Sequence, residues 1–84
     1  MNREDIYNQL NIVFQDVFDD DSIKVENSTS AKDISGWDSM AHINLVLGVE
    51  QEFGIKFKTS EVAQLNNVGE FVELIQTKLS KQLA

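Results

Sequence analysis

The chain has 84 residues, of which 42% are apolar, so it is long enough to form one compact domain and too short for two. It carries 14 acidic residues against 7 Lys and Arg, and this net charge of −7 argues against nucleic acid as a partner and favours proteins with basic surfaces. The absence of Cys excludes disulfides, thiolate zinc sites and a cysteine nucleophile, so any thiol chemistry must come from an added group.

The N-terminal segment predicts an amphipathic helix. Asn2 is a good N-cap, and Glu4 and Asp5 lie in the first turn, where the helix dipole favours negative charge. Apolar residues then recur every three or four positions until about Phe18. The first residues are polar, and no apolar run reaches the length of a membrane span or a signal peptide, so we expect a cytoplasmic protein.

Residues 19–38 lose this periodicity and predict a long loop, anchored only by isolated apolar side chains. Loops of this length are uncommon in compact domains, which indicates a functional segment. The acidic run that begins at Asp19 invites a calcium-binding reading, but the spacing of an EF-hand loop is not met. An EF-hand loop that began at Asp19 would need a glycine at the position of Lys24 and a glutamate at the position of Ser30. We expect a solvated loop and no metal site.

The next helix is predicted from Ser39 to about Phe53, with Asp38 as N-cap and Gly54 as the left-handed residue that follows its C-terminus. It has two apolar faces where a surface helix needs only one. One comprises Leu45, Val46, Val49 and Phe53 and should face the core. The other comprises Met40, Ile43 and Leu47, and it either forms a binding surface rimmed by acids or is also buried between helices.

Two further helices complete the pattern. A short one is predicted to begin at Ser60 and to run to Leu65. A fourth begins after Asn67, with Glu70 three residues later in the arrangement of a capping box.

Ser39 and His42 admit three readings. In the first reading, Ser39, His42 and Asp38 have the residue types of a hydrolytic triad. The chain has only one His and little room for a sheltered cleft, so we expect no enzyme activity. His42 falls on the core side of its helix, where a partly buried imidazole is expected. Ser39 could simply start the helix, or it could anchor a phosphate ester at the positive end of the helix dipole.

The segment Gly36 to Met40, followed by Ile43, Leu45 and residues 50–55, resembles the phosphopantetheine attachment segment of acyl carrier proteins. The resemblance extends over most of the chain, from the first amphipathic helix through the long loop to the entry into the fourth helix. It implies an all-α, four-helix acyl-carrier-like bundle of three longer helices and one short helix, with a long loop between helices 1 and 2. We expect residues 1–84 to form a single carrier domain.

The resemblance also implies a function. Ser39 would carry 4′-phosphopantetheine, transferred from coenzyme A by a phosphopantetheinyl transferase, and the thiol of this arm would hold acyl groups as thioesters. Asp38 would help the transferase to recognise its target as well as cap the helix. The positions at which the family contacts acyl-loading and acyl-processing enzymes with basic docking surfaces are Met40, Ile43, Leu47, Glu50 and Glu52. We expect a monomer.

The sequence departs from the usual fatty-acid pattern at several positions. Met40 replaces the leucine after the attachment serine, and Asn44 and Gln51 stand where acids are frequent. With Trp37 and His42, these departures favour a dedicated carrier in a fatty-acid, polyketide or related pathway. The alternatives are a stand-alone peptidyl or aminoacyl carrier, or an unmodified helical module that binds proteins through Met40, Ile43 and Leu47.

Overall fold

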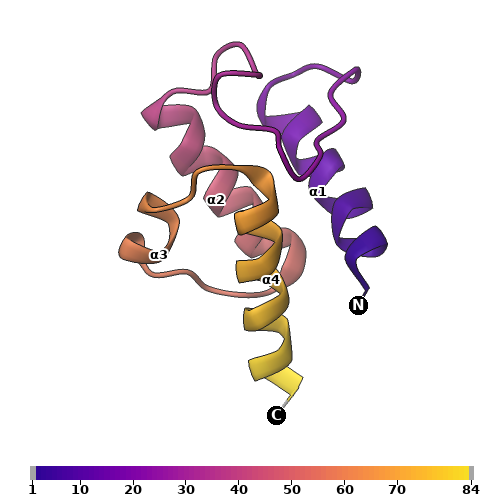
Figure 1. Ribbon diagram of the computed structural model, residues 1–84, viewed down its shortest axis with the longest axis vertical. Helices are drawn as coiled ribbons and strands as arrows, with labels where there is room; N and C mark the ends of the chain where they lie inside the picture. Colours follow the sequence, from indigo (N-terminus) through magenta and orange to yellow (C-terminus); the bar gives the residue numbers. More distant parts are fainter. Residues whose placement is uncertain (1, 84) are drawn as a thin grey trace.

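The computed structural model describes residues 2–83, and it is all-helical over this range (Figure 1). The helices are α1 (Arg3–Val17), α2 (Ser39–Phe53), α3 (Thr59–Ala63) and α4 (Val68–Leu83). The predicted bundle of three longer helices and one short helix is therefore confirmed. The prediction for α3 was wrong in its bounds, because the helix begins at Thr59 and ends at Ala63, so Leu65 lies beyond it.

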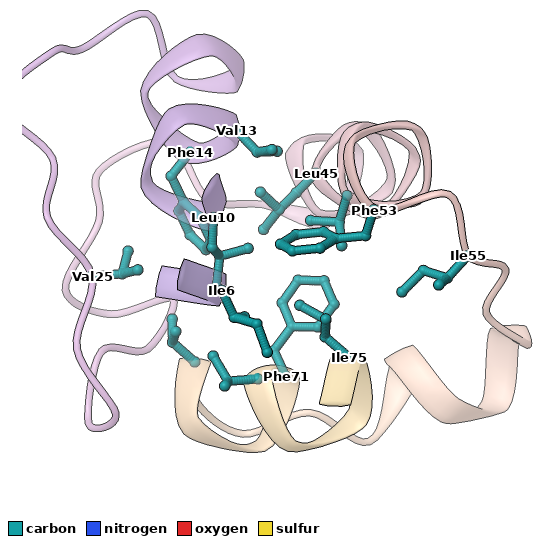
Figure 2. Packing of buried hydrophobic residues seen from close by; sticks show 13 residues of the cluster. Ile6, Leu10, Val13, Phe14, Val25, Leu45, Phe53, Ile55, Phe71 and Ile75 are labelled. Carbon is teal, nitrogen blue, oxygen red and sulfur yellow. The ribbon is translucent and has the colours of Figure 1, made fainter. Parts of the chain in front are cut away.

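One hydrophobic core holds the longer helices together. Helix α1 packs against both α2 and α4, and the short α3 lies to the outside of α2 and α4 (Figure 1). Figure 2 shows apolar side chains from α1, α2 and α4 pointing toward a common centre. The buried residues are Ile6, Leu10, Val13, Phe14, Val25, Leu45, Val49, Phe53, Ile55, Val68, Phe71, Val72 and Ile75. Burial of these side chains is the main force that stabilises the fold.

Polar caps set the ends of α1 and α2. The side chain of Asn2 accepts a hydrogen bond of 2.8 Å from the amide of Asp5, and Asp38 caps α2 in the same manner. Gly54 ends α2 in the left-handed conformation, with φ 67°. All three positions agree with the sequence prediction.

The cap of α4 follows the prediction only in part. The Asn67 side chain accepts from the amide of Glu70 at 2.9 Å, as expected. The carboxylate of Glu70 accepts from the backbone and side chain of Asn66 instead of the Asn67 amide, so the capping box is not reciprocal.

The middle of the long loop is held against the bundle. The amide of Val25 donates to the side chain of Asn11 at 2.7 Å. Farther along, Asn27 accepts from the amide of Gly69 at 2.9 Å through its backbone and from Tyr7 and Arg3 through its side chain. The loop therefore has a defined path toward the start of α2, although it contains no regular element.

Among the residues described, no helix combines the length and the apolar character that a membrane crossing requires.

Candidate functional site

Ser39 is the first residue of α2 and its side chain is exposed to solvent. The Asp38 carboxylate accepts a hydrogen bond of 2.9 Å from the amide of Ala41, and the Asp38 carbonyl accepts one of 2.9 Å from the amide of His42. The amides of Ser39 and Met40 donate to no other group among the described residues. The hydroxyl thus stands beside two unpaired N–H groups at the positive end of the helix dipole, a position that suits a phosphate ester.

The turn before α2 presents this serine outward. Gly36 has φ 87°, a conformation that strains any residue with a side chain, and the amide of Asp38 donates to its carbonyl at 3.0 Å. The sharp reversal brings Trp37 back toward the bundle, where its ring packs edge-on against Phe14 with 5.3 Å between centroids. The aromatic contact and the glycine turn together fix the approach to Ser39.

His42 is partly buried, as predicted, but its partners come from outside the main core. The indole Nε1–H of Trp37 donates to Nδ1 of His42 at 3.2 Å, which requires Nδ1 to carry no proton. Nε2–H then donates to the carbonyl oxygen of Val62 in α3 at 3.1 Å. Both ring nitrogens are engaged away from Ser39, so the base and nucleophile pair of the hydrolase alternative is not formed.

A shallow groove runs beside Ser39, between α2, α3 and the end of the long loop. It is mostly apolar, and we call it the Ser39 groove. Its lining consists of Ala31, Trp37, Asp38, Ser39, His42, Ile43, Val62, Ala63 and Leu65. A flexible arm attached to Ser39 could lie along this surface, because apolar side chains from two helices form its walls.

The face of α2 that carries Met40, Ile43 and Leu47 is exposed, and we call it the exposed stripe. These side chains are 70%, 56% and 51% exposed. The alternative in which both apolar faces of this helix are buried was therefore wrong. The opposite face is buried through Leu45 and Val49, as predicted.

The predicted site residues did not include Ile12 of α1, whose side chain is 58% exposed. Like the residues of the exposed stripe, Ile12 is a large apolar side chain that faces solvent. It lies in a hollow between α1 and α2, at the point where Gly48 lets the two helices approach closely. At about 100° per residue, Ile12 falls on the side of α1 opposite Leu10 and Phe14, so the helical spacing of the sequence carried a signal for its exposure.

The two acids predicted to contact partners have different surroundings. Glu52 is exposed, and its carboxylate makes no bond with another described residue. Glu50 is half-buried, and its carboxylate accepts a hydrogen bond of 2.8 Å from the amide of Phe57, so it also holds the segment that follows α2. A change at Glu50 would therefore disturb this segment as well as the surface charge.

The acidic run at the end of α1 forms a local turn. The Asp20 carboxylate accepts from the amide and the hydroxyl of Ser22 at 2.9 and 2.6 Å, and these bonds hold the pKa of Asp20 below its ordinary value. No cluster of His or acidic side chains that could hold a metal ion occurs in the described part of the chain.

Comparison with known proteins places this geometry in a family. The family model described as "Phosphopantetheine attachment site" matches residues 9–75. The acyl carrier protein of Thermotoga maritima is 29% identical over 92% of this chain and 95% of its own length, and that of Coprothermobacter proteolyticus is 29% identical over 94% and 96%. The solution NMR structure of the holo acyl carrier protein from Geobacter metallireducens is 43% identical, with a TM-score of 0.85 over 92% of this chain and 88% of that one.

Proposed function

The chain belongs to the acyl carrier protein family of phosphopantetheine attachment domains, whose prosthetic group is 4′-phosphopantetheine, and we propose that Ser39 carries this group. The observation that carries the proposal is the exposed hydroxyl of Ser39 at the first position of α2, beside unpaired amides and the Ser39 groove. The residues present fit the group, because a phosphodiester at this position meets favourable backbone dipoles and the arm meets apolar walls.

Attachment requires a separate enzyme, a phosphopantetheinyl transferase that uses coenzyme A. The Ser39 oxygen forms a bond to the phosphorus next to the pantetheine, the pyrophosphate bond of coenzyme A breaks, and adenosine 3′,5′-bisphosphate leaves. The hydroxyl proton passes to a base of the transferase or to water. Once attached, the arm supplies the thiol that this Cys-free chain lacks, and that thiol holds acyl groups as thioesters.

The protein's own residues supply position and recognition. Asp38 caps α2 and orients the first turn, and its exposed carboxylate faces an approaching transferase. The exposed stripe and Glu52 form the proposed docking surface for enzymes with basic surfaces, and Glu50 contributes at its edge. The support is the exposure of these side chains together with the net charge of −7.

We further propose one carrier domain over residues 1–84 that works as a monomer in the cytoplasm, in a dedicated acyl pathway. A single hydrophobic core supports the domain assignment. A peptidyl or aminoacyl carrier would use the same attachment chemistry and differ in cargo. An unmodified interaction module would use the same exposed stripe and leave Ser39 without a role.

Intact mass spectrometry separates these functions. The purified protein is incubated with coenzyme A, Mg²⁺ and a broad-specificity phosphopantetheinyl transferase. We expect a gain of one phosphopantetheinyl group in the wild type and none in Ser39→Ala. Ser35→Ala is the matched control, because Ser35 is also exposed and lies in the preceding loop, and it should load as the wild type does. If the mass of the wild type does not change while a known carrier protein is loaded under the same conditions, the unmodified module is favoured.

A further inference from the structure

The turn that precedes Ser39 is tied to α2 by a hydrogen bond between two rings. The indole Nε1–H of Trp37 donates to Nδ1 of His42 at 3.2 Å, and the ring planes lie at 18° to one another. Trp37 stands two residues before Ser39 and His42 three residues after it, so the bond spans the serine. The sequence contains one Trp and one His, so no other pair of side chains can form the same contact.

This bond exists only while the imidazole is neutral. Nδ1 accepts from the indole, and Nε2–H donates to the Val62 carbonyl of α3 at 3.1 Å. A proton taken from solvent therefore goes to Nδ1, because Nε2 already carries one. Nδ1–H and the indole N–H are then two donors facing each other, so the bond to Trp37 is lost while the bond to Val62 remains. Imidazole groups change charge between about pH 5 and 8.

Without this bond, Trp37 and the first turn of α2 belong to different parts of the fold. The indole packs on α1, with 5.3 Å between its centroid and that of Phe14 and 6.2 Å to that of Phe18. Among the described side-chain hydrogen bonds, only the Asp38 cap then links the first turn of α2 to the residues before it. Protonation of His42 thus releases the turn on which Ser39 is presented.

Few other charges act on this imidazole. His42 lines the Ser39 groove and also a smaller hollow that reaches the start of α4. Among the described residues that line these two hollows, α3 and the entry to α4 present no ionisable side chain, and the loop presents only Asp38. Side-chain carboxyl groups ordinarily titrate well below the imidazole range. A transition between about pH 5 and 8 at this place is therefore assigned to His42.

We propose that His42 is a positioning residue for the loading of Ser39, an inference that rests on Ser39 carrying the arm. As the neutral imidazole it holds Trp37, and it thereby keeps the first turn of α2 and the Ser39 hydroxyl in the orientation that the transferase accepts. The protonated imidazole releases Trp37, and loading slows. The attachment step is therefore pH-dependent through a residue whose ring nitrogens are both engaged away from Ser39.

Loading rates at two pH values test the proposal. Wild type, His42→Asn and Trp37→Phe are loaded from coenzyme A by a broad-specificity phosphopantetheinyl transferase at about pH 8 and about pH 5.5. Intact mass spectrometry measures each rate. The side-chain oxygen of Asn and Nδ1 of His are both bonded to Cγ, so His42→Asn keeps an acceptor for the indole and does not titrate. It reports the pH dependence of the transferase itself. Trp37→Phe keeps a ring beside Phe14 and a titrating imidazole, and it removes the donor.

Relative to His42→Asn, we expect the wild type to load equally fast at about pH 8 and about fivefold more slowly at about pH 5.5, the effect of one neutral hydrogen bond. Trp37→Phe should be about fivefold slower than His42→Asn at both pH values. This variant separates positioning from charge. An imidazolium that only repelled a basic transferase would slow Trp37→Phe on acidification as much as the wild type.

The matched control adds Asn8→His to His42→Asn. It returns one titrating imidazole to an exposed position of α1, and it should load as His42→Asn does at both pH values. The Trp37 indole N–H reports the bond without the transferase. In ¹H–¹⁵N NMR spectra of the wild type its proton resonance should move upfield on acidification, and in His42→Asn it should stay in place.

Two results would overturn the proposal: a ratio of wild-type to His42→Asn loading that is the same at both pH values, or a Trp37→Phe variant that slows on acidification as much as the wild type. An indole resonance in the wild type that does not respond to pH would also contradict it. Circular dichroism at both pH values checks the fold, and if Trp37→Phe unfolds, the loading ratio and the indole resonance decide. Failure of the wild type to load at all, beside a loaded reference carrier, would instead contradict the attachment function, and the indole resonance can still be read.

Discussion

Trp37 and His42 stand on opposite sides of Ser39 in the sequence, and a hydrogen bond of 3.2 Å joins the indole Nε1–H to Nδ1 of the imidazole. The rings are nearly parallel, with centroids 6.1 Å apart. The bond closes a short loop around the proposed attachment residue, so the orientation of the first turn of α2 depends on a contact with the residues before it. The second imidazole nitrogen extends the same contact to Val62 in α3.

The energy of this contact can be measured by a double-mutant cycle. Trp37→Phe keeps most of the ring packing and removes the N–H, and His42→Phe removes the acceptor. We expect a coupling energy of about 1 kcal/mol between the two changes in urea unfolding, as for a partly buried neutral hydrogen bond. If the losses of unfolding free energy in the two single variants simply add up in the double variant, the hydrogen bond does not stabilise the fold. The same cycle between Trp37 and the exposed Asn44 should show no coupling and serves as the control.

Two substitutions at Asp38 separate its capping role from its recognition role. Asp38→Asn keeps a side-chain oxygen that can accept from the amide of Ala41, whereas Asp38→Ala removes it. We expect Asp38→Ala to lower the free energy of unfolding by about 1 kcal/mol and Asp38→Asn to change it little. If the carboxylate is read by the transferase, Asp38→Asn should load more slowly at unchanged stability. Equal loading by the wild type and Asp38→Asn would leave the cap as the whole role of Asp38.

Local chemistry made most helix ends predictable from the sequence. The side chains of Asn2 and Asp38 act within three residues of their own position, and Gly54 needs only its own backbone freedom. The exposed stripe was also predictable, because helical spacing places Met40 and Leu47 opposite the buried face. Phosphopantetheine as the prosthetic group followed from the resemblance, and the family match confirms it. Its attachment to Ser39 stays a prediction.

Features that depend on contacts between distant segments were not predictable. The carboxylate of Glu50 accepts from the amide of Phe57 only because the chain reverses after Gly54. The orientation of the His42 ring depends on Val62 and therefore on where α3 lies. The C-terminal end of α3 was predicted two residues too late. No residue of this helix is buried, so the spacing of apolar residues did not reflect packing against the core and could not locate the end of the helix.

Gly69 is required by the loop that crosses the start of α4. A Cβ atom at Gly69 would lie 3.0 Å from the backbone oxygen of Asn27, which also accepts the Gly69 amide hydrogen at 2.9 Å. Because both segments are held by backbone bonds, we expect Gly69→Ala to lower the free energy of unfolding by about 2 kcal/mol. Gly48→Ala is the comparison: its Cβ would meet the Val13 side chain at 3.0 Å, and the gain in helix propensity offsets part of the clash. A smaller loss at Gly69 than at Gly48 would contradict this account.

The ion pair between Glu61 of α3 and Lys78 of α4 should give a measurable pH dependence. The Lys78 ammonium lies 2.8 Å from the Glu61 carboxylate and, with the Lys58 amide, holds the pKa of Glu61 below its ordinary value. A lowered folded-state pKa stabilises the fold at pH values above the unfolded-state pKa, and this stabilisation is lost as the pH falls through the folded value. In Lys78→Met we expect the pKa of Glu61 to rise toward the ordinary value, as followed by carboxyl ¹³C NMR.

The same pair predicts how stability changes with pH. The difference in unfolding free energy between the wild type and Lys78→Met should be largest near neutral pH and should shrink on acidification. The difference should also be small, because both groups lie near the surface. An identical Glu61 titration in the two proteins would show that the pair does not persist in solution.

Charge reversal at Glu52 tests whether the acidic side of α2 steers basic partners. Glu52 is exposed and makes no bond with another described residue, so Glu52→Lys changes surface charge without removing a structural contact such as the one at Glu50. We expect association with a basic transferase to slow several-fold at low salt, as measured by stopped-flow fluorescence. The difference should fade as ionic strength rises, because the screening length falls to about 10 Å at 0.1 M.

Glu73→Lys is the control for this change. It makes the same change in net charge at an exposed position of α4, and it should have a smaller effect if the partner docks on α2. Equal slowing by both variants would assign the effect to net charge alone, and no slowing by Glu52→Lys at low salt would contradict docking through this side of α2.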